Sequence, residues 1–430
     1  MCGLVFALFP FSIALLALGA LAACVMTTLF NVSTHVVLSR RRPWAKVKPG
    51  ISVLKPLKGI DDDLEANLAS IVNQAYDGPF EILLGAADPD DPALVVARRL
   101  QRRFPNHAIR IVAGHHESGV NPKVANLAAL SAQAHYDAWL ISDSNVQVEP
   151  DYLASLAAEL ADPGVGAISN LVVGDGDGDL GAVLENLHLN SFVVGAVCGA
   201  EVIAQHPVVI GKSMLVRRSA LLRVGGWSRV ADFLGEDYVL GAAVHQTGQR
   251  VVLSSYRVRT VNRTWTMQRF VSRHLRWAQM RRSIAPAIYL LEPLLNPLPW
   301  LVALAGVVSL AGMATPNLLS ALAVAAVGKV ALDALLLTRL RSHAPTLTEI
   351  AAIPLKDAFV LGIWIVGWFR DTVEWRGQRF RIGQGSRLLT ETQGAALTPP
   401  PPPMAAPWTA HSRPPSPSPR SSLARAPDRH

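Results

Sequence analysis

The sequence predicts an α/β protein whose mainly parallel, Rossmann-like sheet is flanked by transmembrane helices. Between residues 50 and 262, short apolar segments alternate with amphipathic helical segments, which is the pattern of a parallel sheet covered on both faces. Before this stretch, and again between residues 294 and 369, the chain is mostly apolar. Half of its 430 residues are hydrophobic, and the mean hydropathy of +0.28 is high for a purely soluble protein.

These observations divide the chain into four expected parts. They are an N-terminal transmembrane anchor (1–39), a cytoplasmic α/β domain (48–285), transmembrane or interfacial helices (286–370) and a disordered proline-rich tail (395–430). The first apolar run, residues 4–30, exceeds the roughly 20 residues that cross a bilayer. Arginines 40–42 follow it, and positive charge marks the cytoplasmic side. We therefore expect a multi-pass protein of the cell inner membrane.

A cleaved lipoprotein signal is the alternative interpretation of the N-terminus. Residues 21–24, Leu-Ala-Ala-Cys, have the form of a lipoprotein cleavage box. No lysine or arginine precedes them, and apolar residues continue beyond Cys24, so the anchor interpretation is favoured. The three cysteines are too few and too scattered for a disulfide framework.

The strands of the α/β domain are predicted from apolar runs. Between the first two we expect a helix whose buried face carries Leu64, Leu68, Ile71 and Val72. Ligands of parallel sheets bind at the carboxyl ends of the strands, so the polar residues after each run are the candidate site. The predicted strands are 51–57, 80–86, 109–113, 139–142 and 165–173.

Two further spans are predicted at 294–313 and 318–337, and Lys329 and Asp333 in the second are spaced to pair on one helix face. A third apolar run, 350–369, contains Lys356-Asp357 and is followed by several arginines. Arginines on both sides of this run belong in the cytoplasm, and a full crossing would violate that rule. A re-entrant or interfacial segment therefore remains an alternative.

Two polar clusters directly follow predicted strands. Asp88 is placed to accept hydrogen bonds from a base or ribose, whereas Asp91 with Pro92 has the form of a helix N-cap. Asp143-Ser144-Asn145 offers carboxylate and amide oxygens, the donors that suit Mg²⁺ or Mn²⁺ and leave room for phosphate oxygens. An ordinary polar turn is the commoner role for such a stretch.

Two more clusters lie on predicted helices. Glu236-Asp237 opens a helix, where acids are favoured by the helix dipole, and a functional Asp237 would be a general base. Arg273 and Arg276 lie three apart, on one helix face, and are able to clamp a diphosphate bidentately, with Trp277 beside them. A cationic interfacial helix that leads into the membrane explains the same arginines without catalysis.

The order of these clusters resembles the ceramide glucosyltransferase family, within the inverting GT-A glycosyltransferases, from about residue 52 to residue 300. Each motif is weak alone, and the combination is specific. The motifs are Val53-Leu54-Lys55-Pro56-Leu57-Lys58-Gly59, Asp88-Pro89-x-Asp91-Pro92, Asn121-Pro122-Lys123-Val124-x-Asn126-Leu127, Asp143-Ser144, Glu236-Asp237-Tyr238 and Arg273-x-x-Arg276-Trp277.

The resemblance implies a GT-A catalytic domain over 48–285 and a role for each matching residue. Asp237 would be the catalytic base, and Glu236 and Trp277 would contact the acceptor. Asp143 and Asn145 would hold Mg²⁺ or Mn²⁺. The animal enzymes carry a His-Pro where this chain has residues 192–195, so acceptor recognition is expected to differ. The residues implied to bind the nucleotide sugar are Asp88, Lys123, Asp143, Arg273, Arg276 and Trp277.

The resemblance also implies the reaction: transfer of glucose from a UDP-sugar to the hydroxyl of ceramide or a similar sphingoid lipid, with inversion. The implied partners are the UDP-sugar, the lipid acceptor and membrane lipids. The net charge of +8 suits phosphates and acidic headgroups, and without a nucleic-acid module we expect no nucleic-acid partner.

Three alternatives remain open. The first is transfer of N-acetylglucosamine to a hopanoid lipid, because the bacterial enzymes for that reaction resemble the same family. The second is a processive polysaccharide synthase, which usually has more C-terminal spans. The third is a non-catalytic membrane scaffold, which the full set of polar motif residues disfavours.

Overall fold

The computed structural model describes residues 2–41, 47–114, 119–206, 208–375 and 378–390. The tail expected to be disordered, 395–430, lies outside the described residues.

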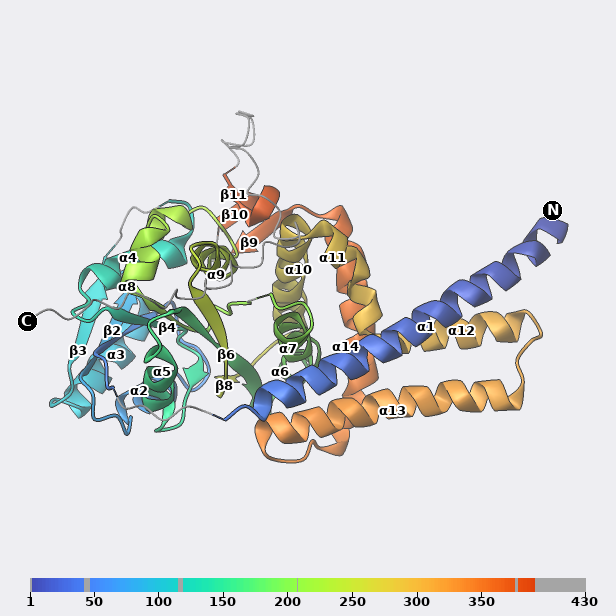
Figure 1. Ribbon diagram of the computed structural model, residues 1–430, viewed down its shortest axis with the longest axis horizontal. Helices are drawn as coiled ribbons and strands as arrows, with labels where there is room; N and C mark the ends of the chain where they lie inside the picture. Colours follow the sequence, from blue (N-terminus) through green and yellow to red (C-terminus); the bar gives the residue numbers. More distant parts are fainter. Residues whose placement is uncertain (1, 42–46, 115–118, 207, 376–377, 391–430) are drawn as a thin grey trace, which may run out of the picture. The chain divides into compact units, whose positions relative to one another are not determined.

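An eight-stranded mixed sheet forms the centre of the α/β domain (Figure 1), in the order β3-β2-β1-β4-β7-β6-β8-β5. The first four of these strands are mutually parallel, and β6 and β8 are parallel to each other, whereas β7 and β5 run antiparallel to their neighbours. The predicted α/β, mainly parallel architecture is confirmed. The strands are β1 (Ile51–Pro56), β2 (Phe80–Ala86), β3 (Ile109–Ala113), β4 (Ala138–Ser142), β5 (Val146–Gln147), β6 (Val165–Asp175), β7 (Ser213–Arg217) and β8 (Arg250–Val261).

The apolar runs locate the first four strands and β6 within two residues at each end. They miss β8, because its serines and arginines interrupt the apolar run although most of the strand is buried. β7 is not among the predicted strands either.

Short helices cover the two faces of the sheet over separate apolar clusters. The predicted buried face of α2 is confirmed, and Asp91 caps α3 as expected by accepting from Ala93 N. The Asp91 carboxylate also accepts from Gly59 N at 2.9 Å, which ties the loop after β1 to this helix. These helices are α2 (Leu64–Val72), α3 (Pro92–Arg103), α4 (Pro122–Ala132), α5 (Tyr152–Leu160), α8 (Arg218–Arg223) and α9 (Glu236–Gln246).

Two helices, α6 (Leu180–His188) and α7 (Val194–Val202), follow β6 and are joined by one π-helical turn, η1 (Leu189–Val193). After β8 comes α10 (Met267–Ile284), then α11 (Pro286–Leu291) and a 3₁₀ turn, η3 (Glu292–Leu295). The apolar helices are α1 (Cys2–Leu38), α12 (Pro297–Leu310), α13 (Pro316–Arg341) and α14 (Leu347–Phe369).

Within the described residues, four helical segments are long and apolar enough to cross a membrane: Pro10–Leu38, Leu180–Val202, Pro316–Arg341 and Leu347–Phe369. Leu180–Val202 was not predicted, and most of it is buried inside the protein. The number rises to five if the pair Pro286–Leu295 and Pro297–Leu310, bent by 67°, is one span. In Figure 1, α1, α12 and α13 extend away from the sheet, and α1 packs on both of the others.

The predicted span 294–313 is not one continuous helix, and it remains a candidate span only as part of the bent pair. It is interrupted at Asn296, which has an extended backbone (φ −136°, ψ 93°), and α12 runs only from Pro297 to Leu310. The reason is Pro297, because a proline disfavours helical geometry in the residue before it and donates no backbone hydrogen bond.

A three-stranded antiparallel sheet follows α14, formed by β9 (Thr372–Trp375), β10 (Gln378–Ile382) and β11 (Leu388–Leu389). It joins the loop before α9, where Leu388 N donates to Asp232 O at 2.7 Å. The segment before α14 also contacts the α/β domain, since Arg257 Nη1 donates to Arg339 O at 2.7 Å. Both flanks of α14 therefore lie on the α/β domain, which favours the interfacial or re-entrant alternative for 350–369.

Candidate active site

Lys123 lies at the centre of a charged cluster at the edge of the sheet where β1 and β4 end. Its Nζ is 3.2 Å from Asp143 Oδ1 and 2.9 Å from Glu236 Oε1, and it donates to Gly211 O at 3.3 Å. The helix that carries it begins here because Asn121 Oδ1 accepts from the backbone N–H of Lys123. The structure thus brings together three of the predicted site residues from distant parts of the chain.

The Lys123 ammonium is held in its charged form. Burial by itself would lower its pKa, but the carboxylates of Asp143, Glu236 and Asp237 outweigh burial and raise the pKa above the ordinary value. Glu236 is itself buried, and its carboxylate is paired with Lys123. Its predicted contact with an acceptor remains a prediction.

Asp237 occupies the first turn of α9, the helix that the sequence predicts to open at Glu236. Its Oδ2 accepts from Gly211 N, and its Oδ1 accepts from Tyr238 N at 2.8 Å. Burial and the neighbouring Glu236 raise the pKa of Asp237 to about 6, against the opposing effects of Lys123 and these two N–H groups. A carboxylate with such a pKa is ionised at neutral pH and is more basic than an exposed aspartate, as a general base should be.

Gly211 makes room for this arrangement. A Cβ at this position would lie 2.9 Å from Asp237 Oδ2 and 3.0 Å from Lys123 Nζ. A side chain at Gly211 would therefore displace the two charged groups.

Two buried lysines, which the predicted site residues do not include, support the turn after β4. Lys55 Nζ donates to Asp143 O at 2.9 Å and to Ser142 Oγ at 3.1 Å, and Lys212 Nζ donates to Asn145 Oδ1 at 2.8 Å. Burial lowers the pKa of Lys55 to about 7, and burial together with Arg273 lowers that of Lys212 to about 8. Lys55 could have been recognised in the sequence as a candidate site residue, because it is a lysine inside an otherwise apolar strand.

Whether Asp143 and Asn145 are able to bind a metal ion depends on which partners their side-chain oxygens already have. Among the described residues, no group of three or more His, Cys, Asp or Glu is placed to hold a metal ion. Asp143 is partly exposed, and the Asp61 carboxylate accepts from Ser144 beside it. Asn145 Oδ1 is bonded to Lys212. The residues fit an ion that takes one carboxylate from the protein and most ligands from water and diphosphate, as Mg²⁺ commonly does.

The arginine motif lies on α10, where Arg273 is held in a fixed orientation. Its Nη1 is 3.4 Å from Glu185 Oε1, and its guanidinium carbon lies 4.6 Å from the Trp277 ring centroid and 5.1 Å from that of Trp265. Glu185, fully buried on α6, also bonds His274 Nε2. Arg276 lies nearly one turn further along α10 and is half-buried.

Glu185 was not predicted as a site residue, although a lone glutamate in an apolar helix was a visible signal. Glu185 also lies near the turn after β4, because Glu185, Arg273 and Asp143 all act on the pKa of Lys212.

Asp88 lies apart from this cluster. It is exposed at the carboxyl end of β2, where its Oδ1 accepts from Asp90 N at 2.9 Å. No hydrogen bond or ion pair among the described residues joins it to Lys123 or Asp143. Its contact with a nucleotide remains a prediction.

Comparison with known proteins identifies the family. Residues 14–388 match the family model of glycosyl transferase family 21. The chain belongs to this family. The matched residues include both the α/β domain and the apolar helices.

The similar curated proteins are ceramide glucosyltransferases, as the sequence motifs predicted. Ceramide glucosyltransferase 1 of Caenorhabditis elegans is 27% identical over 292 residues, 65% of this chain and 61% of that protein. Ceramide glucosyltransferase 3 of the same species is 24% identical, over 79% and 74% of the two chains. The enzyme of Komagataella phaffii is 28% identical, over 57% and 59%. The chain thus matches about three fifths of the length of two of these relatives.

Solved structures give weaker likenesses. A mannosyltransferase from Pyrobaculum calidifontis, in complex with GDP-mannose and Mn²⁺, is 18% identical with a TM-score of 0.49, over 83% of this chain and 99% of that one. Glucosyl-3-phosphoglycerate synthase from Mycobacterium tuberculosis is 16% identical with a TM-score of 0.37, over 60% and 84%.

Proposed function

We propose that this family 21 member is a membrane-bound inverting glycosyltransferase that moves glucose from UDP-glucose to the hydroxyl of ceramide or a similar sphingoid lipid. The observation that carries the proposal is the cluster of Asp143, Lys123, Glu236 and Asp237 at one edge of the sheet. The names of the similar ceramide glucosyltransferases support the choice of sugar and acceptor.

The chemistry is a single displacement. Asp237 takes the proton of the acceptor hydroxyl, whose oxygen attacks the anomeric carbon of the sugar. The bond from that carbon to the UDP oxygen breaks, UDP departs with the bonding electron pair, and a β-glycoside forms. Lys123 pairs with the carboxylates of Asp143 and Glu236 and holds them in place beside Asp237.

Charge on the departing UDP is met by fixed cations. Arg273, which Glu185 and two tryptophans hold in place, and Arg276 beside it form the expected diphosphate clamp. Asp143, with Asn145 directly or through water, is the place for a divalent ion. When bound there, such an ion supplies further positive charge to the diphosphate.

The α/β domain is proposed to lie on the cytoplasmic side of the cell inner membrane. Arginines follow the N-terminal helix at positions 40 and 41 and end α13 at positions 339 and 341. The positive-inside rule assigns all of them to the cytoplasm. The site would then face a nucleotide sugar made in the cytoplasm and a lipid held in the bilayer.

Product analysis tests the proposal. Membranes that carry the protein are incubated with isotope-labelled UDP-glucose or UDP-N-acetylglucosamine and with ceramide or a hopanoid lipid, and the lipids are analysed by mass spectrometry. The expected product is β-glucosylceramide, formed at a greatly reduced rate by membranes carrying Asp237→Asn. A product only from N-acetylglucosamine and hopanoid, a polysaccharide, or no UDP release with any lipid would contradict the proposal.

A further inference from the structure

The C-terminal sheet consists of β9, β10 and β11, with a 3₁₀ turn, η4 (Gln384–Ser386), between β10 and β11. Figure 1 shows it above α9 and α10. It follows α14 in the chain, and the proposed mechanism uses none of its residues. It nevertheless packs against the three segments that carry Lys123, Asp237 and the arginine motif.

One hydrophobic cluster joins the C-terminal sheet to all three of these segments, with one residue from each. Val120 lies three residues before Lys123, and Leu234 lies three residues before Asp237. Met280 lies on α10, about one turn after the arginine motif. Segments that are distant in the sequence therefore share one apolar contact. The sheet contributes Val373, Trp375, Phe380, Ile382 and Leu388 to the cluster.

Ser386, which is fully buried, bonds to the two residues that precede Glu236. Leu234 N donates to Ser386 O at 2.9 Å, and Gly235 N donates to Ser386 Oγ at 3.2 Å. Gly235 is the N-cap of α9 and has no side chain that could cap the helix. The first N–H groups of a helix have no partner inside it, so the Ser386 hydroxyl supplies one from a distant part of the chain.

The same loop before α9 is bonded to the start of α4, the helix of the site lysine. Asn121, the N-cap of α4, donates from Nδ2 to Phe233 O at 2.6 Å. Asp232 Oδ1 accepts from Val120 N at 3.1 Å, and its Oδ2 lies 3.3 Å from Arg387 Nη2 of the C-terminal sheet. The loop is therefore held between the sheet and α4, and both catalytic helices begin beside it.

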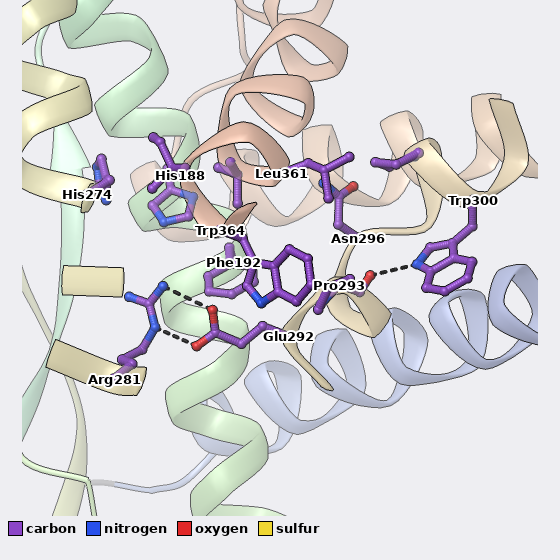
Figure 2. A pocket seen from close by; sticks show the side chains of 13 residues that line it. His188, Phe192, His274, Arg281, Glu292, Pro293, Asn296, Trp300, Leu361 and Trp364 are labelled. Carbon is purple, nitrogen blue, oxygen red and sulfur yellow. Dashed lines mark hydrogen bonds and ion pairs between the residues drawn. The ribbon is translucent and has the colours of Figure 1, made fainter. Parts of the chain in front are cut away.

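The C-terminal part of α10 is fixed in the same way. Gln279 Nε2 donates to Thr372 O at 3.2 Å, at the beginning of the C-terminal sheet. Arg281 forms a bidentate pair with Glu292 of η3, which Figure 2 shows. The helix that carries the arginine motif also contacts β10 and η4. The sheet therefore holds this helix relative to the loop before α9.

The backbone conformation of Ser386 favours a glycine at this position. Its φ of 71° lies in the left-handed region, which costs a residue with a side chain about 1–2 kcal/mol. Residues held in such conformations are concentrated at functional sites. Glycine would adopt the same φ without this cost, and it would lack the hydroxyl that accepts from Gly235. The hydroxyl is thus the group that gives a serine a role here.

We propose that the C-terminal sheet is a positioning element of the active site, and that Ser386 is the positioning residue through which it orients the base Asp237. The bond from Gly235 N to Ser386 Oγ fixes the first turn of α9, where the Asp237 carboxylate accepts from Gly211 N. The inference rests on the proposed function. It adds a residue that lies beyond the apolar helices and outside every sequence motif of the site.

Kinetics of Ser386→Gly with UDP-glucose and a short-chain ceramide test the inference. Glycine keeps the left-handed backbone and removes the hydroxyl, so kcat is expected to fall about tenfold, the worth of one neutral hydrogen bond. The KM for UDP-glucose should stay at the wild-type value, and the thermal midpoint should stay within about 4 °C of it. The matched control is Ser342→Gly, the same substitution at an exposed serine with a φ of 64°, which should leave kcat unchanged.

A double variant shows whether Ser386 acts through the base. In the Asp237→Asn background, Ser386→Gly should cause no further loss of kcat, because the carboxylate that the hydroxyl orients is already gone. The same tenfold loss in both backgrounds, or a wild-type kcat for Ser386→Gly, would overturn the positioning role, as would a thermal midpoint that falls far below the wild-type value. If wild-type protein transfers no glucose to ceramide, the proposed function itself fails.

Discussion

Asp237 lies at the N-terminus of α9, next to the acid Glu236, and its carboxylate accepts hydrogen bonds from two backbone N–H groups. The N–H groups of Gly211 and Tyr238 hold its two oxygens, which fixes the direction in which it can take a proton. Its raised pKa has burial as the largest cause, with Glu236 second. This residue therefore carries the sharpest predictions of the proposed mechanism.

Replacement of Asp237 by asparagine is expected to lower kcat by about 10²- to 10⁴-fold, because general-base catalysis contributes about that much. UDP binding, measured by calorimetry in detergent, should remain. Asp90→Asn, at an exposed position, is the matched control. Near-normal turnover by Asp237→Asn would mean that another group is the base.

The pH dependence of kcat/KM is expected to follow the same carboxylate. The base acts when it is unprotonated, and its pKa is raised to about 6, so activity should fall as the pH drops through about 6. An ordinary aspartate would lose activity only near pH 4. The measurement is a pH–rate profile on membranes, and a flat profile down to about pH 4.5 would contradict the assignment.

Asn145→Asp is expected to lower the Mg²⁺ or Mn²⁺ concentration needed for half-maximal activity. The substitution adds a second carboxylate two residues from Asp143, and carboxylates bind these ions more strongly than amide oxygens do. Activity titrations and Mn²⁺ binding followed by electron paramagnetic resonance measure the effect. Full activity of the wild type in excess chelator would show that Asp143 serves the nucleotide without a metal.

At the scale of elements, a buried group of four charges joins α13 to α14. Lys329 Nζ lies 2.8 Å from Asp333 Oδ2, which confirms the pairing predicted from their spacing, and Lys356 Nζ lies 3.5 Å from the same oxygen. Asp357 contacts both lysines. Two positive and two negative side chains therefore balance where the two helices meet.

Removal of one of these charges should loosen the helix pair. Lys356→Met leaves two buried aspartates with one lysine and is expected to destabilise the protein by about 3–5 kcal/mol. The double variant Lys356→Met/Asp333→Leu keeps the Lys329–Asp357 pair and should recover most of this loss. The thermal midpoint of purified protein in detergent measures both. Equal losses in the single and double variants would indicate a packing effect instead of an unpaired charge.

At the scale of the whole molecule, the contacts of α14 bear on membrane topology. The segments before and after it both touch the α/β domain, through Arg257 at one end and the loop at Asp232 at the other. A helix that crosses the bilayer once separates its ends by the full membrane thickness. These contacts favour α14 as an interfacial helix, with α1, α13 and the bent pair that ends in α12 as the membrane-crossing part.

Cysteine accessibility tests this topology. In a chain without its natural cysteines, His343→Cys and Arg379→Cys flank α14, and Thr315→Cys lies between α12 and α13; all three positions are exposed. A membrane-impermeant maleimide should label positions 343 and 379 from the same side and position 315 from the opposite side. Labelling of 343 and 379 from opposite sides would make α14 a full span.

Much of the fold was predictable because its patterns are local. Apolar runs located β1 to β4 and β6, and Asp91-Pro92 marked the start of α3. β8 was not predicted because its sequence is not apolar. The strand is buried only because other parts of the sheet and its helices cover it. Pro297 was a sequence signal for the helix break at Asn296. The prediction of one continuous apolar run over 294–313 used average hydropathy, which does not register a single proline.

The candidate site divides in the same way. The sequence by itself supplied the candidate acids, the arginine motif and the resemblance to the family, because residue types and their order are properties of the chain alone. Only the tertiary structure decided that Lys123 pairs with Asp143 and Glu236, that Glu185 orients Arg273, and that Asn145 is bonded to Lys212. These partners lie far apart in the sequence, and an ion pair depends on distance in space, which residue order does not specify.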